Sequence, residues 1–335
     1  VLALNRNEST VQIEIPKGSG VCDIAKILKE NNVIDHEIYF KMYAVMRGAS
    51  KNFISGHFQI KTNLDYEAII SFIQSNENRS KDDLIKVTIP EGLSVIECAN
   101  LLEYNHVCNA DDFIAACNDK EIIKEYSFLQ NIPTSENKYY QMEGYLFPDT
   151  YDFYKDQKAY KVVYRLLNNY EYKISKKNSY GLNIIQHTEK LGYTLNELMT
   201  IASLIQVEAA DENDMPKVSS VLHNRLKTKS NNGVTPFGDY GMNLLGMDST
   251  VWYPYHSKDN IPANQKDSFQ SKYDTYKYEG LPPGPICNPG LSAINAALNP
   301  ADTEYYFFCH DNNKNAYYAK TSSEHSETLK KAGLS

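Results

Sequence analysis

One carboxylate interrupts an apolar stretch near the middle of the chain, in the segment "TIASLIQVEAADENDMPKVSSVLHNRL" at residues 200–226. Glu208 follows Ile201, Leu204 and Ile205 by seven, four and three positions, so a helix would place these side chains on one face. A carboxylate on a core-facing stripe loses hydration, and this loss raises its pKa. Such a group can hold a proton at neutral pH and donate it to a leaving oxygen, as a general acid must.

The residues after Glu208 place it at a predicted corner. The acidic run "DEND" is typical of a loop, and a second helix is then predicted to begin at Asp214 with Pro216 in its first turn. Two helices joined by a short loop leave room for a cleft beside the corner. The alternative is structural, because a carboxylate at a helix end can also form an ion pair, here with Arg225 or Lys217.

Other elements could position groups around this corner. Thr194 and Glu197 predict a capping box that starts the helix of Glu208. The segment "GMDSTVWY" at 246–253 combines a carboxylate, two hydroxyls and aromatic rings. The segment "YDTYKYEGLPPGPICNPG" at 273–290 holds four Pro and three Gly, which favours a rigid loop. That loop could serve a binding site or be a structural turn.

Composition excludes several classes of function. The 335 residues are enough for two or three domains, and a formal net charge of -8 argues against a nucleic-acid partner. The sequence has no metal-type Cys or His spacing, no phosphate loop and no serine-hydrolase elbow, so we expect neither metal nor cofactor. The six cysteines are compatible with buried thiols or with disulfides. No stretch approaches the roughly 18 apolar residues that span a membrane.

The N-terminal third contains an internal repeat, in which residues 15–40 align without gaps on residues 89–114 at an offset of 74. Each unit predicts a short strand, a Pro-Gly turn and an amphipathic helix. Because the matched apolar positions face a core, the repeat indicates architecture rather than chemistry. The matched pairs are Pro16 and Pro90, Gly18 and Gly92, Val21 and Val95, Ala25 and Ala99, Leu28 and Leu102, Asn31 and Asn105, and Val33 and Val107.

Together these motifs resemble the endolytic murein transglycosylase family, also called YceG-like. The similar segments follow the family's order over most of residues 143–325: "EGYLFPDTYDF", "ASLIQVEAA", "MDSTVWY", "GLPPGPICNPG", "AINAALNPADTEYYFF" and "TSSEH". The resemblance implies an α+β fold, with duplicated small LysM-like α+β modules before a mixed α+β catalytic domain. The expected domains are residues 1–84 (N-terminal α+β module, the first repeat unit), 85–135 (LysM-like second repeat unit) and 136–335 (catalytic transglycosylase domain).

The resemblance also implies roles for single residues. The family's helix segment reads A-S-I-V-E-K-E-T-A, and its second Glu, the catalytic one, falls on Glu208. Its first Glu falls on Gln206, which cannot titrate, so one candidate acid is left in this helix. The same motifs imply substrate-binding residues in a groove, namely Asp248, Tyr273, Thr275, Asn288 and Glu143.

The implied reaction cleaves the β-1,4 bond between N-acetylmuramic acid and N-acetylglucosamine in peptidoglycan strands and leaves a 1,6-anhydro end. One carboxylate suffices, since the muramyl 6-hydroxyl replaces water as the nucleophile. Two rival interpretations stay open: a hydrolase that uses Glu208 with Asp248, and a glycan-binding scaffold without catalysis. The family further implies cell-wall synthases (penicillin-binding proteins) as partners. It also implies a single-pass N-terminal anchor that holds the catalytic domain outside the cytoplasmic membrane.

Overall fold

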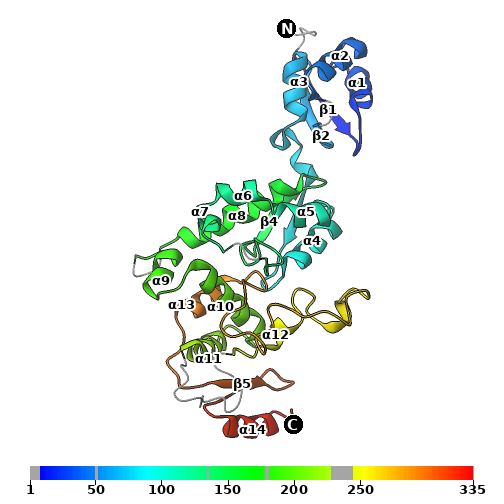
Figure 1. Cartoon of the computed structure of the whole chain (residues 1–335). Coiled ribbons are helices and arrows are strands. Elements are labelled where there is room, and N and C mark those ends of the chain that lie inside the picture. The colour runs from blue at the N-terminus through cyan, green and yellow to red at the C-terminus, as the bar shows by residue number, and fades with distance from the viewer. Residues whose placement is uncertain (1–7, 50–51, 134–135, 178–180, 228–243, 335) are drawn as a thin grey trace. The chain divides into compact units, whose positions relative to one another are not determined.

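The computed structural model describes residues 8–49, 52–133, 136–177, 181–227 and 244–334 (Figure 1). Helices alternate with short strand pairs, which confirms the predicted α+β class. The chain forms two compact units. The first comprises residues 1–87, 101–110 and 150–162, and the second comprises 88–100, 111–149 and 163–335. The domain boundaries expected after residues 84 and 135 stay a prediction.

The first unit is built around a two-stranded antiparallel sheet. Strands β1 and β2 pair with Ile13 opposite Phe58, and both side chains are buried in a core that α1, α2 and α3 complete. A second sheet pairs β3 with β4. The elements are β1 (Thr10–Ile15), α1 (Val21–Glu30), α2 (Glu37–Met46), β2 (Gly56–Lys61), α3 (Tyr66–Ile73), β3 (Leu84–Thr88), β4 (Thr150–Tyr154) and the 3-10 turns Asn76–Asn78 and Lys81–Asp83.

The predicted repeat is confirmed in its local structure. In each copy a strand leads through a Pro-Gly turn into a helix, α1 in the first and α4 (Val95–Tyr104) in the second. Gly18 and Gly92 adopt φ values of 82° and 86°, a left-handed conformation that glycine tolerates without strain. The matched alanines and leucines of the two helices are fully buried.

The second unit has a largely helical part with an aromatic core. Phe128, Tyr145 and Tyr170 contact one another there, with ring centroids 5.0–6.3 Å apart. Some of the tyrosine residues therefore serve core packing and do not line a substrate groove. The helices are α5 (Ala110–Ala116), α6 (Lys120–Glu125), α7 (Ser127–Gln130), α8 (Ala159–Ser175) and α9 (Ile184–Lys190).

The elements that carry the candidate site follow α9. Helices α10 and α13 pack side by side, and α11 contacts both (Figure 1). The hairpin of β5 and β6 pairs Phe308 with Tyr318 and is covered by α14. The elements are α10 (Leu195–Glu208), α11 (Met215–Lys227), α12 (Asp248–Val251), a 3-10 turn (Lys258–Asn260), α13 (Leu291–Leu298), β5 (Phe307–His310), β6 (Ala316–Ala319) and α14 (Ser322–Lys331).

Two further expectations concern membrane segments and thiols. Within the described ranges, no helix is both long and apolar enough to cross a bilayer. Cys98 and Cys287 carry free thiols in the interior, as the buried-thiol interpretation predicts, and Cys22 and Cys309 are free as well.

Candidate active site

Glu208 is the last residue of α10, at the corner that the sequence predicts. The helix starts with the predicted capping box, in which the Thr194 side chain accepts from the Glu197 amide and the Glu197 carboxylate accepts from Thr194. Ile201, Leu204 and Ile205 are fully buried, so the apolar face lies in the core. The chain leaves the helix at Ala209, in an extended conformation, before α11 begins.

A cavity of about 700 Å³ opens beside this corner. Five elements contribute to its wall: Glu208 from α10, Arg225 from α11, Asp248 from α12, His310 from β5 and His325 from α14. The expectation that a cleft opens beside Glu208 is therefore confirmed.

The environment of Glu208 favours its protonated form. Burial is the largest effect and raises the pKa of its carboxyl group, and the nearby charge of Asp248 acts in the same direction. Ser249 opposes this shift, because its hydroxyl donates to Oε1 of Glu208 at 2.6 Å. A positive charge on His310 also lowers the pKa. The net shift is upward, which suits a general acid.

The structural alternative for Glu208 required an ion pair with Arg225 or Lys217. The Arg225 guanidinium instead donates to the carbonyls of Tyr306, at 2.7 Å, and Leu245. The Lys217 ammonium lies over the ring of Tyr318, 5.6 Å from its centroid. Among the ion pairs between described residues, none includes Glu208.

Asp248 is the predicted substrate-binding residue that shares the cavity with Glu208. Its Oδ1 accepts a 2.7 Å hydrogen bond from the hydroxyl of Tyr276, which also lines the cavity. Gly246, in the same wall, has φ of 57°, and an added Cβ there would lie 3.4 Å from the Tyr276 ring. The sequence alone does not distinguish Tyr276, although it lies one residue after Thr275 in the Pro- and Gly-rich segment 273–290.

The β5–β6 hairpin forms a wall that sequence reasoning missed. Phe307 and His310 line the cavity from β5, and the ring of His325, from α14, stacks on Phe307 at 5.1 Å. A local signal existed, since the turn-forming run "DNNKN" at 311–315 separates two aromatic stretches. That signal predicts a hairpin but does not say that its face meets Glu208.

Tyr273 and Thr275 lie in the interior, each 1% exposed, and among described residues neither lines the cavity. Thr275 accepts the Met247 amide on Oγ1 at 2.8 Å and the Gly246 amide on its carbonyl at 3.1 Å, so it holds the loop that carries Asp248. Tyr273 packs against Tyr253, with ring centroids 4.5 Å apart. Direct sugar contact by either residue stays an untested prediction.

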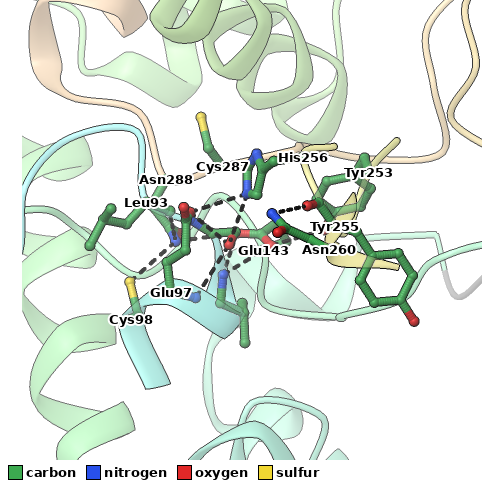
Figure 2. A network of polar contacts seen from close by, with 12 residues as sticks. Leu93, Glu97, Cys98, Glu143, Tyr253, Tyr255, His256, Asn260, Cys287 and Asn288 are labelled. Carbon is green, nitrogen blue, oxygen red and sulfur yellow. Dashed lines mark hydrogen bonds and ion pairs between the residues drawn. The ribbon is translucent and has the colours of Figure 1, made fainter. Parts of the chain in front are cut away.

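Glu143 and Asn288 form a buried polar network (Figure 2). The Glu143 carboxylate accepts from the Val95 amide at 3.1 Å, from the Tyr253 hydroxyl at 2.9 Å and from the Asn288 side-chain nitrogen at 3.2 Å. Burial raises the pKa of Glu143 to about 7, although the Val95 amide and the Tyr253 hydroxyl oppose the shift. The Asn288 oxygen accepts the amides of Gly144 and Leu146, at 3.0 and 2.9 Å. Their contact with substrate also stays a prediction.

An ion pair lies beside this network. His256 Nε2 is 3.2 Å from Glu97 Oε2, which also accepts the amide and hydroxyl of Ser94. Although burial acts to raise the pKa of Glu97, these partners hold it at about 2. Within this pair, the charge of Glu97 adds to the upward shift of the Glu143 pKa, and a positive charge on His256 opposes it. In the described part of the chain, no three His, Cys, Asp or Glu side chains gather as a metal site.

Comparison with known proteins gives the family. A model of the YceG-like family matches residues 13–331, and the chain belongs to that family, as its motifs predict. It is 32% identical over 330 residues to the endolytic murein transglycosylase of Bacillus subtilis (strain 168), covering 97% of this chain and 85% of that protein. The endolytic murein transglycosylase of Streptococcus pneumoniae serotype 2 is 25% identical over 337 residues, covering 95% of this chain and 58% of that longer protein.

A solved structure is similar over the same extent. The crystal structure of a yceG-like protein from Listeria monocytogenes matches with a TM-score of 0.58 at 26% sequence identity. The match covers 96% of this chain and all of that one.

Proposed function

We propose that this chain is an endolytic lytic transglycosylase that cleaves the bond between N-acetylmuramic acid and N-acetylglucosamine within peptidoglycan strands. Membership of the YceG-like family and the likeness to proteins named endolytic murein transglycosylase support the reaction class. One observation carries the assignment to a site. Glu208 is a carboxyl group with a raised pKa, held by Ser249 at the wall of a cavity of about 700 Å³.

The reaction uses Glu208 twice. The protonated carboxyl gives its proton to the glycosidic oxygen as the bond from that oxygen to the muramyl C1 breaks, and the N-acetylglucosamine part leaves with a new hydroxyl. The muramyl O6 then bonds to C1, and the Glu208 carboxylate takes the proton of the 6-hydroxyl. The carboxyl group ends as it began. The nucleophile belongs to the substrate, so its effective concentration is high and no second carboxylate is required.

Hydrolysis is the second candidate, and Asp248 is the observation that favours it. Its carboxylate shares the cavity with Glu208, and two carboxylates beside one glycosidic bond are the usual equipment of a glycoside hydrolase. The hydrogen bond from Tyr276 to Asp248 also suits an orienting or sugar-binding role, which we prefer. A hydrolase would leave a reducing end instead of an anhydro end.

Mass spectrometry of the products from purified uncrosslinked glycan strands tests the proposal. Wild type should give anhydro-muramyl ends, lighter than reducing ends by one water, and Glu208→Gln should slow their formation by at least about 100-fold. Asp248→Asn, the matched control, should keep the anhydro product. Reducing ends from wild type would instead establish a hydrolase. Strands that stay intact with wild type, yet bind it and Glu208→Gln equally, would favour the scaffold.

The proposed substrate also sets an expectation for location and partners. Peptidoglycan lies outside the cytoplasmic membrane, so we propose that the catalytic residues act there, with the chain held by an N-terminal anchor and working beside cell-wall synthases. Protease added to intact spheroplasts should digest the protein. Protection from protease until the membrane is lysed would contradict this location.

A further inference from the structure

His310 shares the cavity wall with Glu208 and is held by a second carboxylate. It is the last residue of β5, and its Nε2 lies 2.7 Å from Oδ2 of Asp214. The side chain of Asp214 is only 8% exposed, while that of His310 is 20% exposed. An imidazole with one nitrogen on a buried carboxylate has a fixed ring orientation, and the carboxylate is an ionic partner for its protonated form.

Asp214 ties His310 to the corner that carries Glu208. Its Oδ2 also accepts the amide of Ala210 at 3.1 Å, and its Oδ1 accepts the hydroxyl of Tyr318 from β6. Ala210 lies two residues beyond Glu208, so one carboxylate joins the end of α10 to both strands of the hairpin. These contacts of Asp214 therefore fix the position of the His310 imidazole relative to the corner that carries Glu208.

The charges around Glu208 make this position significant. Asp248 and a positive charge on His310 act on the Glu208 carboxyl in opposite directions. The charge of Glu208 also acts on Arg225 and on Tyr276, and it acts to raise the pKa of both groups. The Arg225 guanidinium itself donates to the carbonyl of Tyr306. The proposed reaction needs Glu208 as an acid first and as a carboxylate base second. A cation beside Glu208 selectively stabilises the charged carboxylate that exists after the acid step and before the base step.

We propose that His310 is a positioning residue for the lytic reaction, held by Asp214 so that its imidazolium stabilises the Glu208 carboxylate between the acid and base steps. It exchanges no proton with the substrate. The inference rests on the proposed function, yet it makes a statement about Glu208 that can be measured without turnover.

The first test compares His310→Gln with wild type by NMR titration of the Glu208 carboxyl carbon, using Glu208→Gln to assign the signal. Glutamine can still donate to Asp214 but carries no charge. The pKa of Glu208 should rise in His310→Gln, because the positive charge that lowers it is lost. An unchanged titration in His310→Gln overturns the inference, whatever the activity of the protein.

The second test is the pH dependence of kcat/KM on glycan strands. Because Glu208 must start protonated, activity falls as pH rises through its pKa, and His310→Gln should move this basic limb to higher pH. The loss of carboxylate stabilisation should lower kcat by roughly threefold to tenfold. His325→Gln is the matched control, since burial and the charge of Arg225 lower the pKa of His325 and so disfavour its charged form. It should leave the limb in place.

These outcomes separate the inference from the proposed function. A lower kcat with an unmoved limb and a lower Tm would mean that His310 only stabilises the hairpin. A shifted NMR titration with no cleavage by wild type would leave the electrostatic coupling intact and refute the transglycosylase instead.

Discussion

Glu208 and Glu143 are two carboxyl groups in the same compact unit, and burial raises the pKa of both. Their surroundings differ. Glu208 is half-buried, accepts from Ser249 and faces a cavity of about 700 Å³. Glu143 is fully buried and is engaged by a backbone amide, a hydroxyl and an amide side chain. A raised pKa alone therefore does not identify an acid catalyst, because the proton must also reach a substrate.

The glycines beside the two sites show the same difference. Gly246, in the cavity wall, would place an added Cβ 3.4 Å from the movable Tyr276 ring. Gly144, next to Glu143, would place it 2.5 Å from the ring of Pro285. The Glu208 site has room for neighbouring side chains to adjust, whereas the Glu143 site is tightly packed. We expect substitutions at the first to change activity and substitutions at the second to change stability.

Removing each carboxylate should give the largest contrast. Glu208→Ala should lower the rate of strand cleavage by at least about 100-fold with little change in Tm. Glu143→Ala should lower the free energy of unfolding by roughly 3 kcal/mol or more, because three buried donors lose their acceptor. Product mass spectrometry and thermal unfolding followed by circular dichroism measure the two effects. A Glu143→Ala protein that melts like wild type would refute the structural role.

The titration of Glu143 should give the next largest effect, on stability against pH. Its folded pKa of about 7 lies above the ordinary 4.5, so its stabilising contribution is fully present below pH 4.5 and is lost as pH rises to about 7. The loss should approach about 3 kcal/mol, since 7 minus 4.5 is 2.5 pKa units at 1.36 kcal/mol each. Glu143→Gln, which cannot ionise, should show a flatter profile of Tm over this window.

Glu97 supplies the control for that experiment. Its folded pKa of about 2 lies below the ordinary 4.5, so its contribution is present above pH 4.5 and is lost as pH falls towards 2. Glu97→Gln should therefore change the acid side of the profile. A slope between pH 4.5 and 7 that survives in Glu143→Gln would assign the titration to another group, such as His256, whose pKa Glu97 raises.

Local features of this molecule were predictable because local physics sets them. The capping box of Thr194 and Glu197, the buried stripe before Glu208 and the Pro-Gly turns of the repeat all depend on neighbours within a few residues. Helix periodicity and capping therefore sufficed to place Glu208 at a corner. The family resemblance then selected this carboxylate among the other acidic residues.

Long-range packing explains what the sequence did not reveal. Tyr273, Thr275, Asn288 and Glu143 lie in motifs with the composition of a binding loop, but their side chains turn into the interior. Spacing in a Pro- and Gly-rich loop does not say which polar group faces a cleft. His310 reaches the cavity only because β5 and β6 pair and pack beside α11. That approach depends on residues about 100 positions away from Glu208, since 310 minus 208 is 102.

The smallest and sharpest contrast is between two hydroxyl donors. Ser249 donates to Glu208 at 2.6 Å, and Tyr253 donates to Glu143 at 2.9 Å. Ser249→Ala removes a bond that favours the charged carboxylate, so the pKa of Glu208 should rise. The basic limb of kcat/KM should move to higher pH, and kcat should fall by roughly threefold to tenfold.

Tyr253→Phe is the matched change at the closed site. It should lower the free energy of unfolding by about 1 kcal/mol, because one buried hydrogen bond is lost, and it should leave the basic limb where it is in wild type. Both variants are measured by pH profile and by melting curve, so that each hydroxyl is assigned to catalysis, to stability or to both. If Tyr253→Phe also moved the limb, the two carboxylates would be coupled through the interior, and Glu143 would belong to the catalytic machinery after all. If Ser249→Ala changed only Tm, the acid would have to be sought elsewhere in the cavity, with Asp248 as the next residue to substitute.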